Sequence, residues 1–284
     1  MTDQRTCLVT GASSGIGRAA ALGLASMGHR LILVGRDEGK LGRTAAAVLR
    51  RRRSAEVSAY RCDLSLMRDV RGAAERIRRD HRRIDALINN AGARFLRHGL
   101  TDEGIELTLA TNHLGHFALT LLLMGPLRDS GRARIINVSS GAHFGGAGAI
   151  ENVRSARGYD GKRQYAASKL AGVLFAYALA ERLKAGGIAA NAVDPGCAAT
   201  NFSRNNGAWS WLKHRLSYFL KGQLRTPARA AGTIIYLAAS DDVAGLTGRY
   251  FRDKKEMRSS DLSYEKAARD ALWDLSVALC SVDL

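Results

Sequence analysis

The sequence predicts a single α/β domain over residues 1–284, built as a doubly wound parallel sheet of about seven strands with helices on both faces. Short apolar runs that are typical of buried strands recur along the chain, and most of them are separated by stretches of helical length. The length of 284 residues is close to the upper size for one hydrophobic core. A glycine-rich turn follows the first apolar run.

The predicted strands alternate with helices, which implies right-handed crossovers and a sheet that is covered on both faces. They cover residues 6–10, 31–35, 57–62, 84–89, 133–139, 188–194 and 246–251. Ligands bind such a sheet at the carboxyl ends of its strands, so the residues that follow each strand are the candidate site. We expect a substrate lid at about residues 201–225 and a C-terminal helix at about 263–280.

The charge is strongly positive, with 43 basic and 26 acidic residues and a net charge of +17. The arginine runs at 50–53 and 76–83 could bind nucleic acid or an anionic membrane, but no aromatic residues interleave with them. We interpret them as solvated helix faces and expect no nucleic-acid partner. The sequence shows no secretory leader and no apolar run of about 20 residues, which favours a cytoplasmic protein. Peripheral membrane contact is a less favoured alternative.

Cysteine and histidine residues do not show the spacing of a metal site. The four cysteines are far apart in sequence, so we interpret them as reduced thiols. His113, His116 and His143 have no acidic partner or ligand spacing, and we expect structural roles for them and no metal.

The glycine-rich turn TGASSGIG follows the first strand and opens a helix, as in Rossmann dinucleotide-binding domains. Gly11 permits the tight turn, Gly15 permits close approach to a pyrophosphate, and Gly17 permits close packing of helix on strand. The free N–H groups of the helix N-terminus would then face the phosphates.

Six segments in order carry a resemblance to the short-chain dehydrogenase/reductase family. They are TGASSGIG (10–17), NNAG (89–92), TNHLGHF (111–117), NVSS (137–140), YAASK (165–169) and DPG (194–196). The resemblance covers the chain from about residue 5 to 282. The stretches SSGAH and LTGRYFRDKKE are most similar to the retinol-dehydrogenase-like branch.

The resemblance implies four catalytic residues. Tyr165 would exchange a proton with the substrate oxygen, and Lys169, one helical turn away, would stabilise the phenolate and bind the nicotinamide ribose. Ser140 would hold the substrate oxygen. It is chosen over Ser139 because the motif aligns with it, and strand alternation places the two on opposite faces. Asn112 would hold a water that relays protons to Lys169, or would bond only to backbone within its helix.

The resemblance also implies a cofactor site of residues near the strand ends. Its members are Gly11, Ser13, Ser14, Gly15, Ile16, Gly17, Arg36, Asp63, Leu64, Asn90, Ala91, Gly92, Tyr165, Lys169, Pro195, Gly196 and Thr200. NADP(H) is preferred over NAD(H), since Gly35 stands where NAD-dependent members carry an acid and Arg36 could clamp a 2′-phosphate. Ser14, however, stands where many NADP-dependent relatives are basic.

The favoured function is an NADP-dependent oxidoreductase that interconverts a carbonyl and an alcohol on an apolar small molecule. A non-redox cyclisation or dehydration on the same scaffold is one alternative. A cofactor-sensing module is another, although sensors commonly lack Tyr or Lys. Small apolar faces on the helices at 113–127 and 165–185 predict a homodimer or homotetramer. The stretch 207–222 is a lid, a packed surface helix or a membrane contact.

Overall fold

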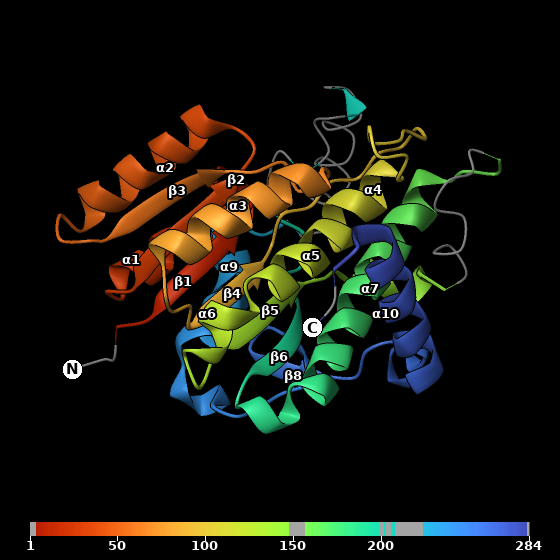
Figure 1. Ribbon diagram of the computed structural model, residues 1–284. Coiled ribbons are helices and arrows are strands. Elements are labelled where there is room, and N and C mark those ends of the chain that lie inside the picture. Colours follow the sequence, from red (N-terminus) through yellow and green to blue (C-terminus); the bar gives the residue numbers. More distant parts are fainter. Residues whose placement is uncertain (1–3, 148–156, 199–201, 203–205, 208–223, 283) are drawn as a thin grey trace.

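The computed structural model describes residues 4–147, 157–198, 202, 206–207, 224–282 and 284 and shows one α/β domain (Figure 1). Its sheet has eight strands in the order β3-β2-β1-β4-β5-β6-β7-β8, and all neighbours are parallel except β7 and β8. The strands are β1 Thr6–Thr10, β2 Arg30–Gly35, β3 Val57–Arg61, β4 Ala86–Asn89, β5 Arg134–Val138, β6 Ala189–Asp194, β7 Tyr250–Arg252 and β8 Lys255–Met257.

Helices cover both faces of the sheet, as predicted (Figure 1). One face carries α1 (Gly15–Ser26), α2 (Glu38–Arg51) and α9 (Pro227–Ala239). The other carries α3 (Met67–Asp80), α4 (Leu107–Leu109), α5 (Gly115–Leu122), α6 (Met124–Arg128) and α7 (Gly161–Arg182), with α10 (Lys266–Cys280) outside α7.

Alternate residues of the strands build two separate apolar cores. Leu8 and Ile32 belong to the core under α5 and α7, whereas Val9 and Leu33 belong to the core under α1 and α9. Successive strand side chains point to opposite faces, and a sheet covered on both sides needs apolar residues at both sets of positions. The near-continuous apolar strands of the sequence therefore give this three-layer arrangement.

The sheet confirms the predicted doubly wound fold and has one strand more than the seven segments that the sequence indicates. The additional strand, β8, forms a hairpin with β7 through Asp253 and Lys254, which have φ values of 53° and 63°. Two-residue hairpin turns with positive φ at both positions usually carry glycine or asparagine. The sequence Asp-Lys therefore gave no indication of a hairpin here. The Lys254 N–H donates to Thr233 Oγ1 of α9 at 3.1 Å, which fixes the turn. β7 begins at Tyr250, later than the expected start at 246.

The small residues that suggested subunit pairing have another explanation. Ala166, Ala171, Ala176 and Ala178 on α7 are buried within the single chain, Ala171 against α10 and Ala176 against β6 and β7, whereas Gly172 is half-buried. Burial of the four alanines is thus explained within one chain, and the homo-oligomer stays a prediction that light scattering tests. The C-terminal helix begins at Lys266, three residues later than expected, after a 3-10 turn.

Two expectations about membranes and the lid stay open. None of the helices that the structure describes is long and apolar enough to span a membrane. Most of the predicted lid, residues 208–222, lies outside the described residues, and so does Thr200.

Candidate active site

The glycine turn after β1 brings two strand ends into close contact. Gly11 and Gly15 have φ values of +67° and +56°, which glycine adopts without a Cβ penalty. A Cβ on Gly17 would lie 2.4 Å from Asn90 Nδ2 and 2.5 Å from the Gly11 carbonyl oxygen. A Cβ on Gly11 would lie 2.9 Å from the Ala91 Cα. The loops after β1 and β4 therefore pack backbone to backbone, and side chains are excluded between them.

Gly17→Ala is expected to destabilise the protein by about 2 kcal/mol or more, because the new methyl group meets backbone atoms that cannot move aside. Urea unfolding measures this loss. Gly42→Ala on α2 is the matched control, since nothing lies within 4 Å of its Cβ position. That change should raise stability by up to about 1 kcal/mol through helix propensity. Equal effects at the two glycines would contradict the packing argument.

Thr10, the last residue of β1, links the loops after β1 and β4 through hydrogen bonds. Its hydroxyl oxygen accepts from the backbone N–H groups of Asn90 (2.9 Å) and Ala91 (3.0 Å), and its carbonyl accepts from the Asn90 side chain at 2.8 Å. Its hydroxyl also contacts His116 Nε2 at 2.9 Å, and His116 Nδ1 donates to the Asn112 carbonyl at 3.0 Å. Burial lowers the pKa of His116 to about 4, so this ring is neutral at pH 7 and acts as a structural link.

A cleft with a volume of about 580 Å³ opens above these loops, at the carboxyl ends of β1, β2 and β4. The predicted cofactor residues that line it are Gly11, Ser13, Ser14, Gly15, Ile16, Gly17, Arg36, Asp63, Leu64, Asn90, Ala91 and Gly92. Sequence reasoning missed Gly35, Asp37, Lys40, Cys62, Ala93, Thr111 and Phe202. Tyr165, Lys169, Pro195 and Gly196 are not part of this lining.

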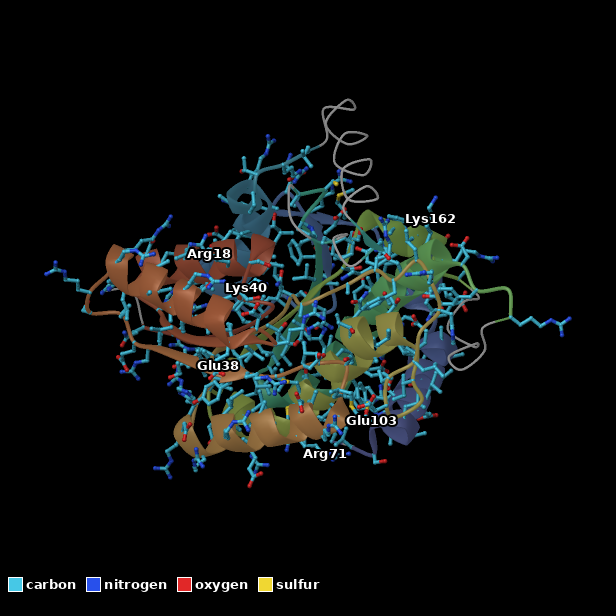
Figure 2. The ribbon with its side chains drawn as sticks, turned by 90° about the horizontal axis from the view of Figure 1, so that it is seen from above. Arg18, Glu38, Lys40, Arg71, Glu103 and Lys162 are labelled. Atoms are coloured by element: carbon cyan, nitrogen blue, oxygen red, sulfur yellow. The ribbon has the colours of Figure 1, made fainter. Side chains whose placement is uncertain are left out.

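Lys40 is the most consequential of the missed residues. It lies in the first turn of α2, four residues after Arg36. The neighbouring helix is α1, which carries Arg18 (Figure 2). The Lys40 Nζ is 2.7 Å from Asp37 Oδ2, and its N–H donates to Asp37 Oδ1 at 2.9 Å. These bonds hold the pKa of Asp37 below its usual value. The acid next to Arg36 is thus engaged as a helix cap.

Asn112 lies in a π-helical turn, η1 (Ala110–Leu114), between α4 and α5. Its Oδ1 accepts from the Ala93 N–H at 2.7 Å, and its Nδ2 donates to the Ala93 carbonyl (2.8 Å) and to Ser168 Oγ (2.9 Å). Both amide hydrogens are therefore used to join the loop after β4 to α7. A proton relay at Asn112 would have to use its oxygen atoms.

Lys169 reaches the same point from α7. A Cβ on Gly92 would lie 3.4 Å from both Asn112 Oδ1 and Lys169 Nζ. The ammonium is buried, donates to the Val138 carbonyl at 3.0 Å and lies 5.7 Å from the centre of the Tyr165 ring. Burial lowers its pKa to about 8, against the opposing effect of the Asp194 carboxylate.

The two serines after β5 point in different directions. Ser139 is buried, and its hydroxyl donates to the Lys169 carbonyl at 2.8 Å, which anchors α7 to the strand end. Ser140 is half-buried, and its Oγ accepts from the Ala142 N–H at 3.2 Å at the start of a 3-10 turn. His143 donates to the Ser140 carbonyl at 2.8 Å and accepts from the Ser260 N–H at 3.1 Å, which fixes that turn. Of the two serines, Ser140 is therefore the more exposed to solvent.

Tyr165 lies in the second turn of α7, where one aromatic ring and two cations surround its own ring. Phe202 contacts its ring edge-on at 5.3 Å between centres, and the Arg94 guanidinium lies 6.0 Å from the ring centre. Burial and Asp194 raise the pKa of Cys197, in the segment after β6, to about 11, so this thiol is protonated at pH 7.

Pro195 and Gly196 follow β6 at the other side of the site. Gly196 has a φ of +73°, its N–H donates to Asp194 Oδ1 at 2.8 Å, and Arg225 Nε lies 2.7 Å from its Cβ position. Arg225 in turn pairs with Asp253 of the β7–β8 turn. The β7–β8 hairpin, which was not predicted from the sequence, thus supports the segment after β6.

The cleft fits a dinucleotide. The glycine turn lines the cleft with backbone, and the N-terminus of α1 begins there with backbone N–H groups that have no partner within the helix, which suits a pyrophosphate. At one end of the cleft are the cations Arg36 and Lys40, and beyond its other end are Tyr165 and Lys169. A nicotinamide ring at that end would lie next to the tyrosine.

Comparisons with known proteins agree with this arrangement. The family model described as short chain dehydrogenase matches residues 5–211. Human retinol dehydrogenase 14 is 35% identical over 285 residues, which cover 96% of this chain and 85% of the relative. A crystal structure of an uncharacterized protein from Mycobacterium paratuberculosis has a TM-score of 0.76 and 31% identity, and the match covers 99% of this chain and 94% of that one.

The structure of actinorhodin polyketide ketoreductase with NADPH has a TM-score of 0.69 and 26% identity, and the match covers 88% of this chain and 97% of the ketoreductase. The family model spans most of the chain, and the similarity to retinol dehydrogenase 14 extends over nearly all of it. The protein therefore belongs to the short-chain dehydrogenase/reductase family of oxidoreductases that act on CH–OH groups, and within that family it is similar to the retinol dehydrogenases.

Proposed function

We propose that the protein is an NADP(H)-dependent oxidoreductase that interconverts a carbonyl and an alcohol on a largely apolar small molecule. The observation that carries this proposal is the placement of Tyr165 and Lys169, one helical turn apart, next to a dinucleotide-sized cleft. Phe202 beside the tyrosine ring supports an apolar substrate.

The roles of the side chains follow from their chemistry. The bound nicotinamide supplies or accepts the hydride. Tyr165 gives its proton to the carbonyl oxygen in reduction and takes it back in oxidation. The Lys169 ammonium lowers the cost of the phenolate, and Ser140 holds the substrate oxygen as its charge develops. Asn112 keeps the loop after β4 at a fixed distance from α7 and so keeps Lys169 in place.

The preference for NADP(H) is supported by charge at the adenosine end of the cleft. Gly35 ends β2 without an acid, and Arg36 and Lys40 line the cleft beyond it, together with Asp37, which pairs with Lys40. A guanidinium and an ammonium on one side can bind a ribose 2′-phosphate together, the first through paired hydrogen bonds and the second as a point charge. The ketoreductase relative that was solved with NADPH is consistent with this preference.

Arg36→Ala is expected to weaken NADPH binding by roughly tenfold to a hundredfold and NADH binding by less than threefold, since only NADPH has the 2′-phosphate. Fluorescence titration of both reduced cofactors measures the two dissociation constants. Arg43→Ala is the matched control, because Arg43 is exposed on α2, the helix that follows Arg36, but does not line the cleft. If Arg36→Ala weakens both cofactors equally, the assignment to NADP(H) is wrong.

The proposed reaction is tested by following NADPH absorbance with a panel of aldehydes and ketones of increasing chain length. The expected result is NADPH oxidation that improves with the apolar size of the substrate. Conversion of a substrate without any change in NADPH absorbance would instead favour the non-redox alternative. Tight NADPH binding with no conversion of any kind would favour a cofactor-sensing module.

A further inference from the structure

A second cation stands beside the catalytic tyrosine. The Arg94 guanidinium carbon lies 6.0 Å from the Tyr165 ring centre, comparable to the 5.7 Å of Lys169 Nζ. Arg94 comes from the loop after β4, two residues past Gly92, and is half-buried. Gly92 and Ala93 line the cofactor cleft, whereas Arg94 does not. Its side chain therefore stands beyond the cofactor cleft, beside the tyrosine.

The loop that carries Arg94 is held on two sides. The Asn206 side chain donates to the Arg94 carbonyl at 2.6 Å and accepts from the Leu96 N–H at 2.9 Å. From behind, the Tyr159 hydroxyl donates to the Phe95 carbonyl at 3.1 Å. Its hydroxyl is also 2.9 Å from the buried Glu106 carboxylate. The backbone under Arg94 is thus fixed at several points, as expected of a preorganised binding group.

The Arg94 charge also acts on the segment after β6. The positive guanidinium opposes the rise in the pKa of the Cys197 thiol. Arg94 is therefore near both Tyr165 and the segment after β6. Phe202 places an apolar ring against the same tyrosine.

We propose that the substrate carries a carboxylate, which Arg94 binds while the reacting carbonyl contacts Tyr165. This inference rests on the proposed function and narrows its substrate class to apolar carbonyl or alcohol compounds that bear an acid group. A planar guanidinium binds a carboxylate through two parallel hydrogen bonds, and partial burial strengthens them. An apolar ring on one side and a fixed cation on the other suit an amphiphilic molecule.

The test compares 4-carboxybenzaldehyde with its neutral methyl ester as substrates, using NADPH and the full-length protein. The wild type is expected to reduce the acid with the higher kcat/KM. Arg94→Met, which keeps the apolar stem, should lower kcat/KM for the acid by roughly tenfold to a hundredfold and for the ester by less than threefold. Arg94→Lys should fall between wild type and Arg94→Met. Arg97→Met on the same loop is the control, since its side chain is exposed, and both substrates should be unaffected.

A binding measurement keeps the inference testable without turnover. Benzoate should bind to the NADP⁺-loaded protein at least tenfold more tightly than benzamide, and Arg94→Met should abolish that difference in calorimetric titrations. Reduction of the ester as efficiently as the acid, with no benzoate preference, would overturn the inference and leave the proposed reaction intact. Equal losses for acid and ester in Arg94→Met would also overturn it, because Arg94 would then act on the tyrosine alone. Selective benzoate binding without NADPH oxidation by any aldehyde would support the anion site and contradict the proposed reaction.

Discussion

Tyr165→Phe is expected to lower kcat by about 10²–10⁴-fold, the range that one positioned proton donor contributes. The substitution removes only the phenolic oxygen, so the ring keeps its edge contact with Phe202 and its place beside Lys169. NADPH should therefore bind within about threefold of wild type, since the ring stays in place and only the phenolic oxygen is lost. Initial rates of NADPH oxidation and fluorescence titration of NADPH measure the two effects separately.

The matched control is Tyr236→Phe on α9, on the far side of the sheet from α7. It removes a phenolic oxygen away from the cleft and should leave kcat unchanged. If Tyr165→Phe kept most of its activity, the proton would have to come from another group and the proposed mechanism would be wrong. If NADPH binding fell with kcat, the loss would reflect a disturbed site instead of a missing proton donor.

The parts of the site that the sequence predicts are those that depend on local geometry. The glycine turn needs positive φ at Gly11 and Gly15, and close approach at Gly17, so its residues are constrained within a few positions of the chain. Tyr165 and Lys169 lie on one helix, and their separation follows from helical spacing alone. The parallel order of strands then brings the loops after β1 and β4 together without further information.

The parts that the sequence does not predict depend on contacts between distant segments. The use of both Asn112 amide hydrogens on Ala93 and Ser168 could not be read from a motif. Packing within one chain buries Ala171, Ala176 and Ala178 of α7, which had suggested a pairing surface. Lys40 is an exception, since its position four residues after Arg36 at a helix start was a signal that could have been used.

Lys169→Met is expected to abolish activity and yet to make the cofactor-free protein more stable at pH 7, by about 1–3 kcal/mol. Lys169 is 5% exposed, and among the described residues its ammonium donates to one group, the Val138 carbonyl. The fall of its pKa from 10.5 to about 8 corresponds to roughly 3 kcal/mol of cost for holding the charge in the native state. Methionine fills similar space without a charge, although it leaves the Val138 carbonyl without that donor.

The direction in which stability changes with pH distinguishes the cost of the buried Lys169 charge from an effect of repacking around methionine. Below pH 8 the native and unfolded states both carry the Lys169 proton, so the native state bears the full cost of the buried charge. Between about pH 8 and 10.5 the native lysine loses its proton first while the unfolded chain still binds it. The stability of the wild type must then rise relative to Lys169→Met, and the advantage of the variant should shrink.

Urea unfolding of both proteins at pH 7 and pH 10 measures this difference, and other titrating groups cancel because they are common to both. Lys162→Met on the same helix is the control, since Lys162 is exposed and its substitution should give the same small change at both pH values (Figure 2). An advantage of Lys169→Met that is equal at pH 7 and pH 10 would show that the ammonium is not costly in the native state. A shrinking advantage would mean that the fold keeps a destabilising charge where the proposed reaction requires one, because a phenolate at Tyr165 costs about 4 kcal/mol at pH 7 without a neighbouring cation.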